Sequence, residues 1–231
     1  MSNSIRDTCP HPSNPRRDNN LWLQLWKDRQ QDGFHLLAAN PLLIRFWPTL
    51  KAGRCQRILV PLCGKSLDMV WLSEQGYEVI GIELSTIAVK AFFAENRLKA
   101  TRQRIGNFVR WRAGNISIWC GDYFSMTAKQ LGKIDAVLDR AALTALASET
   151  RKAYIDQLVK LTESDTRIML FTLEVIDKAT DQSAKPIDKE LTELCKDSYT
   201  IKLLYSEIIP KDRGNRSELS DEYLKVYQLR K

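Results

Sequence analysis

The segment that most constrains the fold is RILVPLCGKSLDMVWLSEQGYEVIGIELS, which runs from Arg57 to Ser85. Its first six residues form a β-branched run typical of a buried parallel strand. Residues 65–76 then place apolar side chains at helical spacing and end at a glycine, which predicts a helix with Gly76 just beyond its end. The apolar run at 77–84 predicts a second strand. The segment is therefore expected to form a β-α-β unit, the crossover that parallel strands require.

Predicted strands and helices continue to alternate along the chain, which indicates a mainly parallel sheet covered by helices on both faces. The last two strands have no helix between them, so they are expected to make one edge of the sheet antiparallel. Further helices are predicted at 20–31, 40–47, 85–98 (with Ser85 as N-cap), 148–162 and 186–196, further strands at 133–140, 166–175, 199–210 and 222–231, and a hairpin at 108–122.

The composition favours a single domain of an ordinary globular protein. A chain of 231 residues with 44% hydrophobic and 27% charged residues supports one sizeable core. Residues 1–18 are polar and contain no apolar segment of a secretory signal, so they are predicted to be a flexible leader before one domain at 19–231. No apolar run approaches the roughly 20 residues that a membrane helix needs.

The cysteines and histidines make both disulfides and a metal site improbable. The five cysteines form no C-x-x-C pair and no closely spaced even set, and the chain contains only two histidines, His11 and His35. A reducing cytoplasm is the expected location. We expect a metal-independent protein that acts as a monomer.

The net charge of +7 admits two interpretations. Lys and Arg are distributed along the chain and mixed with 28 acidic residues, which favours a solvated surface over a nucleic-acid footprint. An attraction for small anionic substrates fits the charge equally well. A basic protein that binds or modifies nucleic acid remains the alternative of another class, and a steep salt dependence of oligonucleotide binding would reveal it.

The turn after the first strand, PLCGKS, contains one glycine where dinucleotide-binding turns contain three. Pro61 and Leu62 occupy positions where a pyrophosphate needs free amide groups and space, and only Gly64 remains. Glu83 ends the second strand about 20 residues later, which is the distance at which an acid reaches a ribose diol. A ligand with an adenosine but no phosphate satisfies both features, and S-adenosylmethionine is such a ligand. Glu83 and Gly64 could also serve only the turn.

Three polar residues follow two later strands, at the same edge of the sheet. Asp122 and Tyr123 come after the strand of NISIW, where a carboxylate and a neighbouring amide could read an adenine edge. An aspartate that forms a turn is the alternative. Arg140 ends the next strand and could hold the carboxylate of methionine, or it could pair with Asp139 or Asp135.

Several of these motifs together resemble the thiopurine S-methyltransferases, especially the bacterial ones. The resemblance runs from about Leu21 to the last strand, and its most specific elements are PLCGKS and the pair of tryptophans followed by GFH. It implies the doubly wound, seven-stranded, mainly parallel sheet of class I methyltransferases, with an antiparallel edge strand. It also implies S-adenosylmethionine as cofactor. The contacts it implies are Trp26, Leu62, Glu83, Asp122, Tyr123 and Arg140 for the cofactor, and Phe34 and, more loosely, Arg213 for the acceptor.

The implied reaction is an in-line displacement in which the protein positions an acceptor and excludes water. An aromatic or heterocyclic thiol ionises readily, so strong base catalysis is unnecessary, and His35 is interpreted as a packing or capping residue. Trp22 and Trp26, one helical turn apart, are expected to form a lid over the cofactor, or simply the core face of their helix. Methylation of other soft nucleophiles (halides, aliphatic thiols, selenium or tellurium species) remains open as an alternative.

Overall fold

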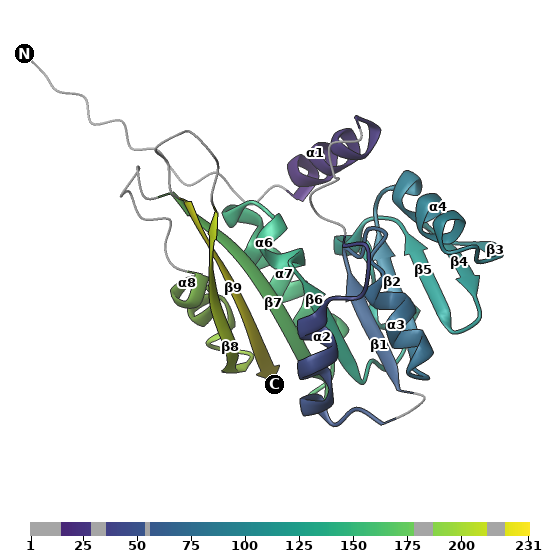
Figure 1. Cartoon of the computed structure of the whole chain (residues 1–231). Coiled ribbons are helices and arrows are strands. Elements are labelled where there is room, and N and C mark those ends of the chain that lie inside the picture. Colours follow the sequence, from purple (N-terminus) through teal and green to yellow (C-terminus); the bar gives the residue numbers. More distant parts are fainter. Residues whose placement is uncertain (1–14, 29–35, 54–55, 178–186, 212–219) are drawn as a thin grey trace, which may run out of the picture.

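The computed structural model of the chain describes residues 15–28, 36–53, 56–177, 187–211 and 220–231. They form one sheet with the strand order β3-β4-β5-β2-β1-β6-β7-β9-β8 (Figure 1). The strands are β1 (Arg57–Pro61), β2 (Glu78–Glu83), β3 (Thr101–Ile105), β4 (Phe108–Ala113), β5 (Ile116–Cys120), β6 (Ala136–Arg140), β7 (Arg167–Asp177), β8 (Thr200–Lys211) and β9 (Ser220–Arg230).

Seven of these strands, from β5 to β8 in the sheet order, make the predicted class I arrangement. Strands β5, β2, β1, β6 and β7 are parallel to one another. Strand β9 runs antiparallel to both β7 and β8. The predicted strand count is wrong by two, because β3 and β4 extend the opposite edge as antiparallel strands. The predicted hairpin at 108–122 contains β4 and β5. The sequence of β3, TRQRI, carries no apolar alternation and is exposed along most of its length.

Helices cover both faces of the sheet and enclose two apolar cores. In β1 the side chain of Leu59 belongs to one core, while Ile58 and Val60 belong to the other, as expected from the alternation of a strand. Both faces are therefore buried, which explains the nearly continuous apolar sequence of the central strands. The helices of one face are α2 (Pro41–Phe46), η2 (Trp47–Leu50), α3 (Asp68–Glu74) and α4 (Thr86–Glu95), and those of the other are α5 (Ala128–Leu131), α6 (Ala142–Ala145), α7 (Ser148–Leu161) and α8 (Ile187–Cys195).

Local sequence signals explain several helix ends. The hydroxyl of Ser85 accepts a hydrogen bond from the amide of Ala88, so the predicted N-cap of α4 is confirmed. Gly76 follows Gln75, the C-cap of α3, and has a φ of 90°, so its predicted place just beyond the helix is confirmed.

Helix α1 (Pro15–Lys27) lies above the carboxyl-terminal edge of the parallel strands (Figure 1). The helix predicted at 20–31 therefore begins five residues earlier, at a proline, which is favoured in the first helical turn. The last four residues of the predicted leader, 15–18, belong to this helix, and the side chain of Asp18 is buried. Phe34, His35 and Arg213 lie outside the described residues.

Candidate active site

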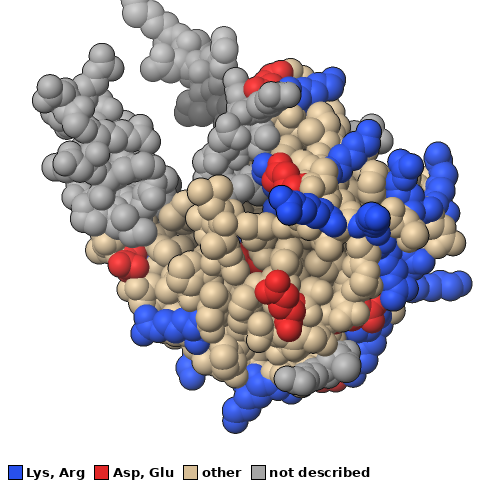
Figure 2. All heavy atoms as spheres, turned by 45° about the vertical axis from the view of Figure 1, so that its right-hand side comes forward, with Lys and Arg blue, Asp and Glu red and all other residues tan. Residues whose placement is uncertain are grey.

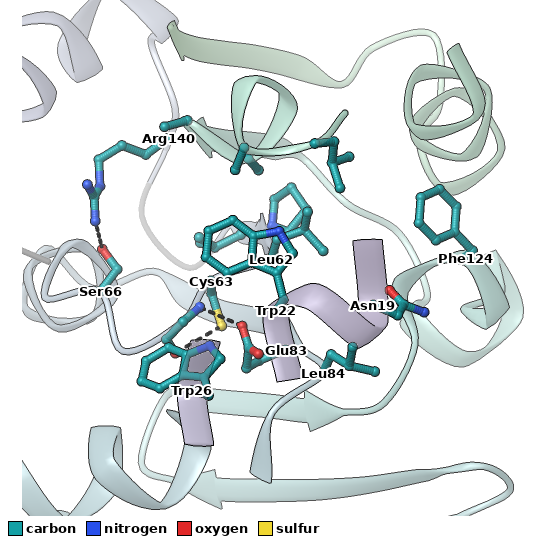
Figure 3. Close-up of a pocket in the computed structure, with 17 residues that line it drawn as sticks. Asn19, Trp22, Trp26, Leu62, Cys63, Ser66, Glu83, Leu84, Phe124 and Arg140 are labelled. Carbon is teal, nitrogen blue, oxygen red and sulfur yellow. Dashed lines mark hydrogen bonds between the residues drawn. The ribbon is translucent and has the colours of Figure 1, made fainter. Parts of the chain in front are cut away.

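A pocket opens at the carboxyl ends of β1, β2 and β6, under helix α1 (Figure 3). Its floor is the turn after β1, where two residues adopt left-handed backbone angles. Leu62 has a φ of 47° and Gly64 a φ of 53°. A non-glycine residue in this region costs about 1–2 kcal/mol, so the surrounding contacts must fix the backbone of Leu62. One such contact is the hydrogen bond from the amide of Cys63 to the carbonyl oxygen of Ile82, at 3.0 Å.

Glu83 joins the ends of the first two strands. Its Oε2 accepts a hydrogen bond from the amide of Gly64 at 2.8 Å, and its Oε1 accepts one from the amide of Ser85 at 2.7 Å. The side chain is only 6% exposed and lines the pocket. Burial raises the pKa of the Glu83 carboxyl, while the hydrogen bonds from Ser85 and Gly64 lower it. A carboxylate has about four acceptor sites, and the backbone amides of Ser85, Gly64 and Leu84 lower its pKa by hydrogen bonding, so capacity is left for a ligand hydroxyl.

The side chain of Arg140 is held by groups from the first β-α turn. Its Nε lies 2.5 Å from Oδ2 of Asp68, and its Nη2 donates to the hydroxyl of Ser66 at 3.0 Å. Asp68 is 1% exposed, and its Oδ1 accepts from the amide of Asn40 at 2.8 Å. Arg140 therefore pairs with Asp68, and not with either of the partners considered from the sequence, Asp139 and Asp135. Arg140 lines the pocket, and Figure 3 shows its guanidinium directed toward Ser66.

Asp139, the neighbour of Arg140, points away from the pocket and fixes its wall. Its Oδ1 accepts from the amides of Ala142 and Leu143 at the start of α6, and its Oδ2 accepts from the hydroxyl of Tyr154 at 2.7 Å. Burial raises the pKa of Asp139 to about 6, against the effect of these three hydrogen bonds. Ala141, which lies between Asp139 and the start of α6, has a φ of 61° and lines the pocket. The pocket thus has a second non-glycine residue in the left-handed region.

Helix α1 contributes Asn19, Trp22 and Trp26 to the pocket. Their spacing of three and four residues places them on one face of the helix. Trp26 is 4% exposed, and the close-up shows both indole rings over the turn that carries Leu62 and the carboxylate of Glu83 (Figure 3). Both tryptophans therefore line the pocket from α1, and their role as a lid stays a prediction.

The predicted adenine readers, Asp122 and Tyr123, do not line the pocket. Asp122 caps a short 3-10 helix, η3 (Tyr123–Ser125), where its carboxylate accepts from the amide of Phe124 at 3.1 Å. The ring of Tyr123 stacks on that of Tyr154 in the core, with 5.0 Å between their centroids. Phe124, from the same turn, lines the pocket in their place. Cofactor contacts of Asp122 and Tyr123 therefore stay a prediction, and Phe124 is the residue of this turn that lines the pocket.

The remaining groups of the lining are apolar or inert. Cys63 is buried, and both this burial and the charge of Glu83 raise its thiol pKa well above the ordinary value. A thiol with a raised pKa is a poor nucleophile, which agrees with its interpretation as a small buried hydrophobe. Among the described residues, no group of three or more metal-ligating side chains comes together. In the same part of the chain no helix is long and apolar enough to cross a membrane.

Solved structures share this fold. A methyltransferase from Burkholderia thailandensis, the 1,6-didemethyltoxoflavin-N1-methyltransferase with bound S-adenosylhomocysteine, superposes with a TM-score of 0.64 over 98% of this chain and 93% of its own, at 17% identity. The chain thus has the Rossmann-like fold of that methyltransferase, with its pocket at the carboxyl ends of the parallel strands.

The sequence comparisons are more specific. The model of the family "Thiopurine S-methyltransferase (TPMT)" matches residues 17–231. The thiopurine S-methyltransferase of Stutzerimonas stutzeri is 47% identical over 92% of this chain and 90% of its own. That of Methylococcus capsulatus is 42% identical over 81% of this chain and 85% of its own. The chain belongs to the thiopurine S-methyltransferase family. The predictions of a methyltransferase that uses S-adenosylmethionine and acts on thiol sulfur are therefore confirmed.

Proposed function

We propose that the acceptors of this methyltransferase are aromatic or heterocyclic thiols and that its pocket binds S-adenosylmethionine through Glu83 and Arg140. The observation that carries the proposal is that two anchored charged side chains, Glu83 and Arg140, line one mainly apolar pocket. Glu83 lines the pocket and has acceptor capacity left for a ribose hydroxyl. The guanidinium of Arg140 matches a carboxylate such as that of the methionine part, because it offers several parallel donors.

The apolar walls fit the other parts of the same ligand. We propose that Leu62 and Trp26 pack against it from below and above, and that Phe124 contacts the adenine ring. Backbone groups next to Asp122 and Tyr123 would then read the adenine edge. The turn after β1 is closed by Leu62 and by the bond between Gly64 and Glu83, so it presents no cradle of free amides for a pyrophosphate.

The chain's own residues have three tasks in the reaction. When bound, S-adenosylmethionine supplies a methyl group that a nucleophile can displace from sulfur. An acceptor thiolate would displace this methyl group and leave a thioether and S-adenosylhomocysteine, so no residue of the chain would need to move a proton. Arg140 and Glu83 fix the position of the methyl donor, and Trp22 and Trp26 exclude water from above. Phe34 and Arg213 remain proposed acceptor contacts, and this proposal rests on the family resemblance alone.

A methyl-transfer screen with radiolabelled cofactor tests the acceptor class. We expect turnover of thiophenols and thiopurines, with much lower kcat/KM for iodide, alkyl thiols and selenite. Higher kcat/KM for any of the latter would replace the proposed acceptor class. Calorimetry provides the separate test of the cofactor site: S-adenosylhomocysteine should bind, whereas NAD of equal concentration should not.

The finer predictions on organisation remain proposals as well. We propose that residues 19–231 form one domain, because helices on both faces pack against a single continuous sheet. We propose a cytoplasmic monomer without a nucleic-acid partner. The three cysteines of the described residues, Cys63, Cys120 and Cys195, are free and buried, which agrees with a reducing compartment. Sedimentation of the purified chain measures its mass in solution and so tests whether it is a monomer.

A further inference from the structure

One edge of the sheet carries a local excess of positive charge. Residues 96–121 contain six cations and no acidic residue, so this stretch alone contributes +6 to a net charge of +7. It runs from the end of α4 through β3 and β4 to β5. Figure 2, which brings this side of the molecule forward, shows Lys and Arg side chains gathered on it. We name this surface the basic edge, and its cations are Arg97, Lys99, Arg102, Arg104, Arg110 and Arg112.

The charges of the basic edge are not neutralised by the rest of the described chain. The nearest acid in sequence, Glu95, pairs with Lys65 at 2.8 Å. The one hydrogen bond between side chains within the edge runs from Arg110 to the amide oxygen of Gln103. Within the described residues, none of the six cations forms an ion pair with a carboxylate. The edge therefore carries a local positive field that a solvated surface with mixed charges lacks.

Strand β3 also presents unused backbone groups. It is the outermost strand of the sheet, and no described strand pairs with its outer side. A two-residue turn, Gly106–Asn107, joins it to β4, so the flanking Ile105 and Phe108 form a hydrogen-bonded pair. Hydrogen-bonded and non-bonded pairs alternate along an antiparallel ladder. Counting back from Ile105, Arg104 and Arg102 therefore fall at the non-bonded pairs. Their backbone N–H and C=O groups point away from β4.

We propose that the basic edge binds an extended acidic segment of a partner protein, which adds to the sheet as a strand beside β3. The main chain of the segment would pair with Arg102 and Arg104, and its carboxylates would lie against the arginines on both faces of the ribbon. The field of the edge supplies the charge complementarity, and the outward backbone groups supply the register.

Two other occupants fit less well. A second copy of this chain would place arginine opposite arginine at an edge-to-edge contact, which like charges disfavour. Nucleic acid would use the arginines but not the strand edge. The aromatic rings on which its bases would stack are already covered, because the guanidinium of Arg102 lies 5.1 Å from the ring centroid of Trp111 and that of Arg110 5.5 Å from that of Trp119.

Fluorescence anisotropy tests the proposal with a labelled peptide of about 12 residues that alternates Glu and Thr. The same peptide with Gln for Glu and a DNA duplex of equal length are the comparison probes. We expect the acidic peptide to bind best, and its affinity to fall several-fold between about 50 mM and about 300 mM salt. No binding of the acidic peptide to the wild-type chain would overturn the proposal. Tighter binding of the duplex would assign the edge to nucleic acid instead.

Matched variants separate charge from backbone pairing. Arg102→Ala with Arg104→Ala should weaken peptide binding about tenfold or more, as the loss of charge-assisted hydrogen bonds does. Lys160→Ala with Lys189→Ala, two exposed lysines on the α7 and α8 side, removes the same charge and should change little. Arg102→Pro loses the guanidinium and the outward N–H, so it should bind about threefold to tenfold more weakly than Arg102→Ala.

Equal affinities of Arg102→Pro and Arg102→Ala would refute strand addition, and equal affinities of the two double variants would refute the basic edge as the binding surface. Each variant is first checked for an unchanged melting temperature and unchanged S-adenosylhomocysteine binding. The cofactor pocket contains none of the substituted residues, so this check reports folding alone.

Discussion

Replacing Glu83 with glutamine tests whether this residue binds ligand or only fixes a turn. The two carboxylate oxygens accept from two different backbone amides, at 2.8 Å and 2.7 Å. A glutamine of the same shape has one acceptor oxygen, so its NH2 group must face either the Gly64 or the Ser85 amide. An unsatisfied buried donor costs about 1–3 kcal/mol. We therefore expect the free energy of unfolding of Glu83→Gln to fall by about this amount.

The loss of cofactor affinity is a separate quantity. If Glu83 also accepts from the ribose, the variant loses at least one charge-assisted hydrogen bond, which corresponds to about 1.5–3 kcal/mol, or about a tenfold to 150-fold weaker Kd for S-adenosylhomocysteine. Calorimetry measures the Kd, and urea unfolding measures the stability.

Glu78→Gln is the matched control, since it makes the same change at the other end of β2. Glu78 is half exposed and pairs with Arg57 at 3.3 Å, so it should change stability by less than about 1 kcal/mol and leave the Kd unchanged. A Glu83→Gln protein that is destabilised but binds S-adenosylhomocysteine with wild-type affinity would show that Glu83 serves the turn only.

Three other changes probe the pocket wall, the lid and the acceptor site. The pKa of Asp139 is raised to about 6 from an unfolded value near 4, so the folded chain binds more protons between these values and loses stability as the pH rises through them. Urea unfolding at about pH 4 and about pH 7 measures the free energy of unfolding of Asp139→Asn minus that of the wild type. This difference should be more favourable to the variant at pH 7 than at pH 4, by up to about 3 kcal/mol, and an equal difference at the two pH values would contradict the raised pKa. Deleting residues 1–14 should leave turnover nearly unchanged, whereas deleting residues 1–27 removes Trp22 and Trp26 and should lower kcat/KM by at least about tenfold; equal activities would show that α1 is not a lid. Phe34→Ala should lower kcat/KM for a thiophenol by about twofold to tenfold and that for iodide less, and an unchanged thiophenol value would place the acceptor pocket elsewhere.

The sequence predicted those parts of the site that depend on local spacing. The β-α-β unit, the turn with Gly64 and the carboxylate of Glu83 all lie within 30 residues, and their geometry follows from the fold of that unit alone. Trp22 and Trp26 are one turn apart on a helix, so their shared direction was also predictable. Even the wrong start of α1 did not alter which face these two residues occupy.

Contacts between distant segments were not predictable in the same way. Arg140 and Asp68 are 72 residues apart, and either carboxylate close to Arg140 in sequence was the simpler partner. Asp139 is drawn to the opposite side by Tyr154 and the start of α6. Similarly, whether Asp122, Tyr123 or Phe124 faces the pocket depends on the packing of Tyr123 against Tyr154, which a single stretch of sequence does not reveal.

The two charged groups of the pocket share a property that bears on how the site works. Glu83 is fixed by amides that follow β1 and β2, and Arg140 is fixed by Ser66 in the turn after β1 and by Asp68 at the start of α3. Each group is therefore oriented before a ligand arrives, and binding need not order its side chain, which would otherwise cost about 0.5–1.5 kcal/mol for each immobilised residue. Leu62 and Ala141, the two non-glycine pocket residues with positive φ, follow the neighbouring strands β1 and β6. Their strain bends the chain sharply at both strand ends, which leaves room between the strand tips for a ligand. The site is thus formed where the sheet reverses its direction of winding, and its charges are anchored by the turns that create this space.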